Sequence, residues 1–203
     1  MVVCAASFAV FSLFWTSLTY LLTAAPFSYS ASQIGLLGLA GVAGAFAARR
    51  AGILHDRGWS APATGAALAV LALSLVAGWA ASTSIIVLIV VVVLDMAGQS
   101  IVVLGQTRLF ALAGSDRSRL NTAFVVGNFL GGAIGSAGAG PLWSSGGWAA
   151  IMIAALAVTL LGLVVWALTR GRLKEAGSPG EVSPPYAEKA DAFPVPRDLC
   201  EGY

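Results

Sequence analysis

Asp95 is the residue whose position most calls for a chemical explanation, because it is a carboxylate inside an aliphatic stretch. Ten aliphatic residues run without a break from Ile85 to Leu94 and lead directly to it. Gln99 follows four residues later, so on a helix it shares the same face. An acidic group in such surroundings is typical of substrate binding or proton coupling in a membrane. A buried structural hydrogen bond is the alternative.

The cost of that charge indicates where its side chain must point. A carboxylate at the middle of a membrane helix costs about 2.5–3.5 kcal/mol. Each Val, Ile or Leu of the same segment favours insertion by about 0.3–0.6 kcal/mol, so the segment still prefers the membrane. The cost persists unless Asp95 faces a polar cavity, pairs with a cation or keeps a proton. We therefore expect Asp95 to face a wet central cavity rather than lipid.

The composition of the chain is that of a membrane protein. Hydrophobic residues make up 58% of the sequence and charged residues 10%, against roughly 25% charged residues in soluble domains. Residues 1–48 contain no Asp, Glu, Lys or Arg. The net charge is only +2, which argues against a nucleic-acid partner. The lipid bilayer is the first partner that the sequence implies.

The elements that position Asp95 are uncharged stretches long enough to cross about 30 Å of hydrocarbon as helices. The predicted helices lie near residues 5–25, 30–48, 61–81, 84–105, 120–142 and 147–169. The fold class is therefore all-α, a polytopic membrane protein with six transmembrane helices. They form one bundle over residues 1–175. Residues 176–203 are rich in proline and mixed charges, and we expect them to be a disordered cytoplasmic tail.

The basic residues support this count and predict the orientation. They fall in the second and fourth connections and after the last segment, on one side of a six-crossing bundle. Those outside the tail are Arg49, Arg50, Arg57, Arg108, Arg117, Arg119, Arg170, Arg172 and Lys174. Cytoplasmic loops carry an excess of Lys and Arg. Both termini are expected in the cytoplasm, in a multi-pass protein of the cell membrane.

The six segments form two triplets with the same order of character. The first and fourth carry polar and aromatic residues, including Trp15 and Tyr20 in the first. The second and fifth are rich in glycine, which favours close helix contacts, and the third and sixth are apolar. Two triplets of opposite orientation suggest an inverted repeat, an arrangement that places transporter sites near the midplane.

Two stretches resemble a known family. "GILHDRG", Gly52 to Gly58, resembles the Gly-x-Leu-Ala-Asp-Arg-x-Gly loop of the major facilitator superfamily, although Gly58 directly follows Arg57. The stretch from "LDMAGQS" to "AGPLW", over residues 94–143, is similar to helices ten and eleven of its drug and sugar efflux permeases.

The resemblance implies the carboxyl-terminal half of a twelve-helix transporter, with a 3+3 inverted repeat. In that family the first and fourth helices line the substrate cavity, which makes candidates of Asp95, Gln99, Trp15 and Tyr20. The second and fifth helices meet the other half. The glycines expected in that inter-bundle packing are Gly41, Gly44, Gly127, Gly131 and Gly135.

The loop motif has two interpretations. The resemblance implies that Gly52, Asp56, Arg57 and Gly58 form a state-stabilising cluster. Alternatively, Asp56 caps the helix that follows it, and Arg57 only contributes to topology.

The function implied by the resemblance is transport of a small-molecule substrate by alternating access, as a secondary active, proton-coupled efflux permease. No motif suggests an enzyme, a cofactor or a metal site, and His55 is isolated. The partner is either the missing N-terminal six-helix bundle or a second copy. The alternative is an inactive fragment or a non-transporting membrane subunit that associates through its Gly-rich helices.

Overall fold

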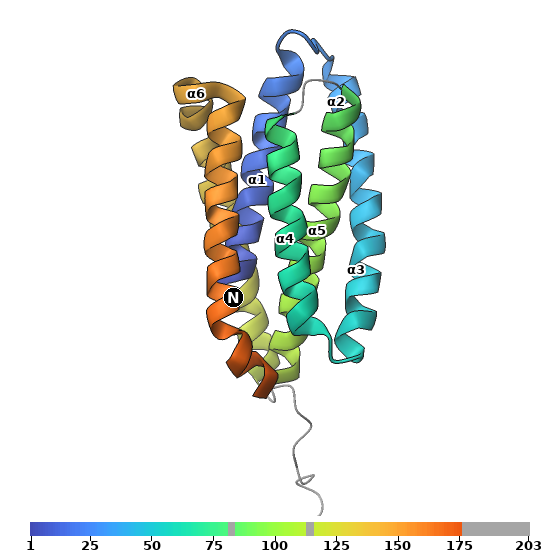
Figure 1. Ribbon diagram of the computed structural model, residues 1–203, viewed down its shortest axis with the longest axis vertical. Helices are drawn as coiled ribbons and strands as arrows, with labels where there is room; N and C mark the ends of the chain where they lie inside the picture. Colours follow the sequence, from blue (N-terminus) through green and yellow to red (C-terminus); the bar gives the residue numbers. More distant parts are fainter. Residues whose placement is uncertain (81–83, 113–115, 176–203) are drawn as a thin grey trace, which may run out of the picture.

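The computed structural model describes residues 1–80, 84–112 and 116–175, and every regular element in these ranges is a helix. The helices run side by side along the long axis of the molecule (Figure 1). In chain order they are α1 (Val2–Thr23), α2 (Ala31–Leu37), the 3-10 turn η1 (Gly38–Ala40), α3 (Gly41–Asp56), α4 (Ser60–Trp79), α5 (Ser84–Leu112) and α6 (Arg117–Glu175). The predicted tail, 176–203, lies outside the described residues.

Four helices of the described chain are long and apolar enough to cross a membrane. They are α1, α4, the part of α5 over Ile89–Ala111 and the part of α6 over Arg117–Arg170. This number is smaller than the six predicted crossings for two reasons. The predicted second segment is divided into shorter helices, and the predicted fifth and sixth segments both lie within α6.

The helix α6 consists of two arms, because its backbone leaves the helical conformation at two adjacent glycines. Gly146 has φ −164° and ψ 18°, and Gly147 has φ 59° and ψ −146°. The positive φ of Gly147 is a conformation that glycine adopts without steric cost. The chain turns back on itself at this end (Figure 1). The arms, 117–145 and 148–175, cover the predicted helices 120–142 and 147–169.

The segment predicted as one helix over 30–48 is interrupted. It begins with a capping box in which the Ser30 N–H donates to Oε1 of Gln33 at 2.8 Å and the Gln33 N–H donates to Oγ of Ser30 at 3.4 Å. The α-helix then tightens into η1 at Gly38 and resumes as α3, which continues to Asp56. Several glycines in this region weaken the α-helical preference, and 3-10 turns are common where one helix passes into another.

Two pairs of helices form the bundle, and a third element joins them. The helix α1 packs along α6, and α3 packs along α5. The helix α4 lies against both α5 and α6, whereas α1 and α5 touch only sparsely. Figure 1 shows α4 in front of the space between α1 and α5. The bundle is therefore closed by α4 on one side and is more open on the other, along α1 and α5.

Two tryptophans fix the second arm of α6 to both ends of α4. The Trp148 Nε1 donates a hydrogen bond to the carbonyl oxygen of Gly78 at 2.8 Å. The Trp166 Nε1 donates to the carbonyl oxygen of Ala61 at 2.9 Å. Gly78 lies in the last turn of α4, where the intrahelical ladder leaves carbonyl oxygens free. Ala61 lies in the first turn, so its carbonyl oxygen accepts the tryptophan N–H through a second lone pair.

The contact between α1 and α6 is a close approach of two backbones, which we call the α1–α6 seam and define by Ala5, Ala9, Gly131 and Gly135. A Cβ added at Gly131 would overlap the carbonyl oxygen of Ala5, and one at Gly135 would overlap that of Ala9. Small residues allow membrane helices to approach in this way. The helices can pack this closely only because both α6 positions lack a side chain.

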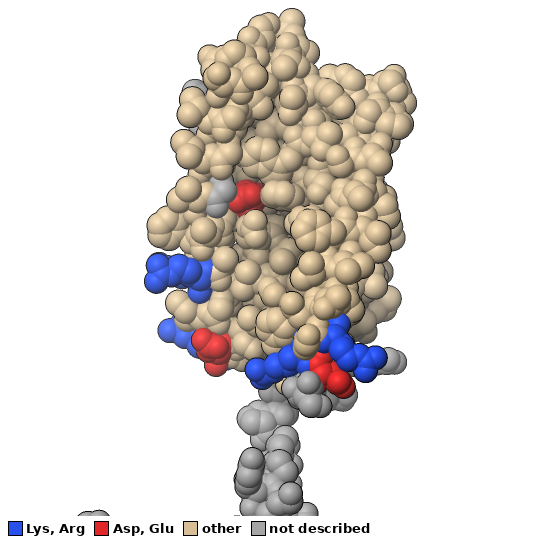
Figure 2. All heavy atoms as spheres, turned by 180° about the vertical axis from the view of Figure 1, so that it is seen from behind, with Lys and Arg blue, Asp and Glu red and all other residues tan. Residues whose placement is uncertain are grey.

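Apart from Asp95, the charged residues of the described chain gather at one end. Figure 2 shows the Lys and Arg side chains of that face in its lower third. The rest of that face is almost entirely uncharged. This distribution follows the connections that carry arginine in the sequence.

Candidate functional site

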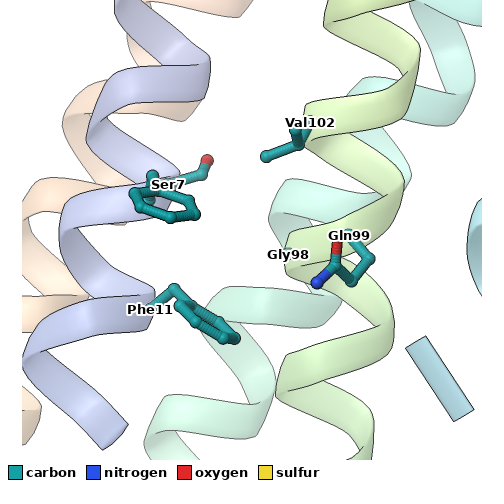
Figure 3. A pocket seen from close by; sticks show the side chains of 6 residues that line it. Ser7, Phe11, Gly98, Gln99 and Val102 are labelled. Carbon is teal, nitrogen blue, oxygen red and sulfur yellow. The ribbon is translucent and has the colours of Figure 1, made fainter. Parts of the chain in front are cut away.

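A hollow lies between α1 and α5, where these two helices pack sparsely. Its lining residues come from both helices and face one another across the gap (Figure 3). They are Ser7, Phe8 and Phe11 of α1 and Gly98, Gln99 and Val102 of α5. We call this hollow the α1–α5 groove. It is mainly apolar, with the Ser7 hydroxyl and the Gln99 amide as its polar groups.

Aromatic rings form the α1 wall of the groove. The ring centroids of Phe8 and Phe11 are 5.8 Å apart, and those of Phe11 and Trp15 are 6.1 Å apart. Residues three and four apart share one face of a helix, so these rings stack along α1. The Nε1 of Trp15 is buried and has no hydrogen-bond partner in the described part of the chain. It is a donor available at the end of this aromatic row.

Asp95 lies in α5 with only 2% of its surface exposed. Its Oδ2 is buried and finds no hydrogen-bond partner among residues 1–80, 84–112 and 116–175. This oxygen points at α3, because a Cβ added at Gly44 would overlap it. We call this contact the α3–α5 seam and define it by Gly44, Asp95 and Gln99. Burial without a partner is costly for a carboxyl group in any protein.

Gln99 connects the seam to the groove. Its Cγ is 2.9 Å from the place that a Cβ on Gly44 would occupy. The same side chain lines the hollow between α1 and α5. In Figure 3 its amide lies on the side of α5 that faces α1. Asp95 is one helical turn away on the same face of α5, but its Oδ2 is directed at α3 and it does not line the groove.

Not all four predicted cavity residues come together. Gln99 lines the groove, and the ring of Trp15 contacts that of the lining residue Phe11. Asp95 is not a lining residue, because its Oδ2 is directed at Gly44 of α3 and not into the expected cavity. Tyr20 is 39% exposed, and its ring packs against Trp143 at 5.6 Å, apart from the groove. Their roles in binding or coupling stay predictions.

Sequence reasoning missed Phe8 and Phe11. Their spacing to Trp15 was the available signal, because residues 8, 11 and 15 fall on one helical face. In so apolar a segment, however, many sets of residues have this spacing.

The loop motif forms the end of α3. The Gly58 N–H donates to the carbonyl oxygen of His55 at 2.8 Å, and the Trp59 N–H donates to that of Leu54 at 2.9 Å. This is a Schellman motif, in which Gly58 occupies the left-handed position with φ 75°. The last glycine of the motif is therefore explained by helix termination.

The interpretation of Asp56 as a cap of the following helix is wrong. Asp56 is the last residue of α3 and is exposed. The N-cap of α4 is Trp59, and no side chain donates or accepts a capping hydrogen bond there. Arg57 is exposed as well, and a Cβ on Gly52 would meet nothing within 4 Å. A state-stabilising role for this loop stays a prediction.

The glycines predicted for inter-bundle packing have different surroundings. Gly131 and Gly135 contact α1, and Gly44 contacts α5, so their close approaches occur within this chain. Gly127 is different, because a Cβ there would meet nothing within 4 Å. For Gly41 the structure describes only its place as the first residue of α3. A contact of any of them with a second bundle stays a prediction.

A second buried polar pair lies toward the charged end of α5. The Nη2 of Arg108 is buried, and it has no hydrogen-bond partner within the residues that the structure describes. The Cys4 thiol is buried nearby on α1 and donates to the carbonyl oxygen of Ile101 at 3.7 Å. Sequence reasoning assigned Arg108 only a role in topology, because no neighbouring residue in the sequence indicates that its side chain is buried.

Two relatives among known proteins illustrate what this chain is similar to. The "Uncharacterized transporter YgaY" of Escherichia coli O157:H7 is 42% identical over 161 residues, which cover 79% of this chain and 41% of that protein. The "Probable transporter SCO4007" of Streptomyces coelicolor is 33% identical over 169 residues, which cover 83% of this chain and 39% of that protein. The chain thus spans about two fifths of the length of these relatives. No family model matches it, and no solved structure is significantly similar.

Proposed function

We propose that this chain is the C-terminal six-helix half of a secondary active transporter of the major facilitator type. In this proposal it moves a small molecule out of the cell by alternating access, in exchange for protons. The observation that carries the proposal is Asp95, whose buried Oδ2 lacks a hydrogen-bond partner in the described chain and which lies one helical turn from Gln99, a lining residue of the α1–α5 groove. Ionisable residues at such positions are typical of ion and substrate pathways.

The relatives support transport as the general role. Both are named transporters, and the aligned regions cover most of this chain. Their greater length supports a further part of the transporter beyond the region that this chain matches. A transport role needs no covalent chemistry, and the described residues contain no group of three His, Cys, Asp or Glu that could hold a metal ion.

The pairing of helices supports an inverted repeat. In a six-segment numbering, α1 is the first segment and α5 the fourth, and the fifth and sixth are the arms of α6. The first segment packs with the fifth at the α1–α6 seam, and the fourth packs with the second at the α3–α5 seam. Exchanging the two triplets turns one pairing into the other. The apolar third and sixth segments also pair, through Trp148 and Trp166.

The groove supplies the elements of a binding site near the middle of the bundle. Phe8, Phe11 and Trp15 provide an apolar wall, and Gln99 provides an amide that can donate and accept hydrogen bonds. Asp95 would bind a proton in one state and release it in another as its surroundings change. The second bundle would complete the cavity from the open side of the groove.

The charged end supports an orientation with both termini in the cytoplasm. Lys and Arg side chains gather at one end of the bundle (Figure 2), and α3, α5 and α6 carry arginines. An excess of Lys and Arg on one side is typical of the cytoplasmic side of the cell membrane. The alternative of a non-transporting subunit is less favoured, because Gly44, Gly131 and Gly135 already make their contacts within the chain.

The proposal is tested with everted membrane vesicles from cells that express the complete transporter. Respiration acidifies the vesicle interior, and a proton-coupled efflux carrier dissipates this gradient when its substrate is added. A panel of small molecules is screened with a pH-sensitive dye, and the active compounds are tested again on Asp95→Asn. We expect the variant to reach the membrane in normal amount and to lose the response.

Asp116→Asn is the matched control, since it makes the same chemical change at an exposed carboxylate outside the candidate spans. It should respond like the unmodified protein. An undiminished response in Asp95→Asn would refute the role of Asp95, and a panel without any active compound in a well-expressed carrier would count against proton-coupled efflux.

A further inference from the structure

We infer that Gly44 is a positioning residue for the carboxyl group of Asp95. Its missing side chain leaves the space that Oδ2 occupies, and it thereby keeps this carboxyl group in the α3–α5 seam and out of the α1–α5 groove. The inference deepens the proposed function and depends on it for its relevance to transport. The geometry that it asserts can be tested without any transport assay.

The contact between the two residues is direct. A Cβ on Gly44 would overlap Oδ2 of Asp95 and would lie 3.2 Å from its Cγ. It would also lie 2.9 Å from Cγ of Gln99. The smallest possible side chain at position 44 therefore collides with both polar residues of the site. Among the glycines whose surroundings the structure describes, only Gly44 has this contact with a carboxyl group.

The displaced carboxyl group has one open direction that is not lipid. Val91 and Leu94 beside it are completely buried, and the exposed side of α5, which carries Ile89 and Met96, would bring a carboxyl group against acyl chains. Toward α1 the packing is sparse, and the hollow beside Gln99 offers space. A methyl group at position 44 should therefore rotate Asp95 toward the groove.

This displacement is compatible with folding. The atoms that must give way are Oδ2 of Asp95, at the end of its side chain, and Cγ of Gln99, and both belong to side chains that can change rotamer. The helix backbones of α3 and α5 need not separate. Gly44→Ala should consequently fold and insert, with its carboxyl group in a new place.

The test measures the accessibility of the carboxyl group directly. Membranes from cells that express the full chain are treated with dicyclohexylcarbodiimide, an apolar reagent that reacts with protonated carboxyl groups in membranes. The carboxyl O–H adds across a C=N bond of the reagent, and the product rearranges to a stable N-acylurea on the residue. Mass spectrometry of the peptide that contains Asp95 gives the labelling rate at one fixed pH.

We expect slow labelling of the unmodified chain, because Asp95 is buried, and labelling several-fold faster in Gly44→Ala. Gly35→Ala is the matched control, since it adds the same methyl group to the same predicted segment where nothing lies within 4 Å. It should label like the unmodified chain. Asp95→Asn should remove the label and thereby identify the site. Equal or slower labelling in Gly44→Ala would overturn the inference.

A double-mutant cycle covers the case in which Gly44→Ala is poorly folded. Asp95→Ala removes the atoms that overlap the new methyl group, so Gly44→Ala should cost less stability in that background than in the unmodified chain. An equal cost in both backgrounds would show that Gly44 serves only helix packing, and the inference would fall.

The two proposals fail in different ways. Faster labelling of Gly44→Ala together with unchanged transport would keep Gly44 as the positioning residue and would contradict the transport role of Asp95. Unchanged labelling of Gly44→Ala together with loss of transport in Asp95→Asn would contradict the positioning role of Gly44 and would keep the transport role of Asp95.

Discussion

The α1–α6 seam and the α3–α5 seam both depend on glycine, but the glycines face different atoms. At the α1–α6 seam Gly131 and Gly135 face the backbone carbonyl oxygens of Ala5 and Ala9. At the α3–α5 seam Gly44 faces the end of the Asp95 side chain. A backbone can move only with its whole helix, whereas a carboxyl group can rotate. The same residue type therefore fixes a helix distance in one seam and a side-chain position in the other.

Small residues therefore serve helix packing in the α1–α6 seam and the placement of a polar side chain in the α3–α5 seam. The α1–α6 seam should tolerate almost no enlargement, because its neighbours are rigid. The α3–α5 seam should tolerate a small side chain at the cost of moving a polar group. The following predictions compare the two seams, in order of decreasing effect on stability.

Gly135→Ala should be the most damaging of these changes. Its Cβ would overlap the carbonyl oxygen of Ala9, so α1 and α6 must separate along the seam. Overpacking of this kind costs about 3 kcal/mol. Unfolding of the purified chain in mixed micelles with increasing dodecyl sulfate measures the loss, and a loss below about 1 kcal/mol would contradict a rigid backbone contact.

Gly44→Ala should cost clearly less than Gly135→Ala. The new methyl group displaces Asp95 and Gln99 from their rotamers, and such a change costs about 1 kcal/mol. The same unfolding titration measures it. If both alanine variants lose the same free energy, the distinction between the two seams is wrong.

Thr16→Val tests the polar edge of the α1–α6 contact. The Thr16 and Ser136 hydroxyl groups share a hydrogen bond of 3.1 Å between α1 and the first arm of α6. Hydrogen bonds between membrane helices contribute about 0.6 kcal/mol on average. We expect a loss of that size in the titration, and Ser136→Ala should give a similar value because it breaks the same bond.

Gly127→Ala should have the smallest effect on this chain. A Cβ at that position would meet nothing within 4 Å, and substitutions in open positions usually change stability by less than about 0.5 kcal/mol. The variant also tests the predicted inter-bundle packing. A neutral result in this chain together with a loss of assembly in the complete transporter would place Gly127 at the second bundle.

The sequence predicted the helices better than their contacts. Hydropathy correctly placed Asp95 within a helix and the arginine-containing connections at the ends of helices. Both predictions depend only on the composition of one continuous segment. The four-residue spacing of Gly131 and Gly135 predicted a close approach. It could not identify α1 as the partner, because the register between two helices depends on their packing.

The surroundings of the candidate site could not be predicted from the sequence either, because they also depend on how separate helices pack. Gly44 and Asp95 are distant in the chain, and no local pattern indicates that they meet. The break at η1 was also missed, since "GLLGLAGVAG" contains no proline to interrupt a helix. The motif glycine Gly58 is the opposite case, because a local backbone requirement explains it completely.

The reversal at Gly146 and Gly147 ties the two seams into one mechanical unit. So short a connection between the arms of α6 prevents them from drifting apart at that end. The first arm is held by α1, and the second is held by α4, which in turn lies on α5. Any rocking of this bundle during a transport cycle would consequently move all of these helices together as a rigid body, and only side chains such as Asp95 would be left to respond independently.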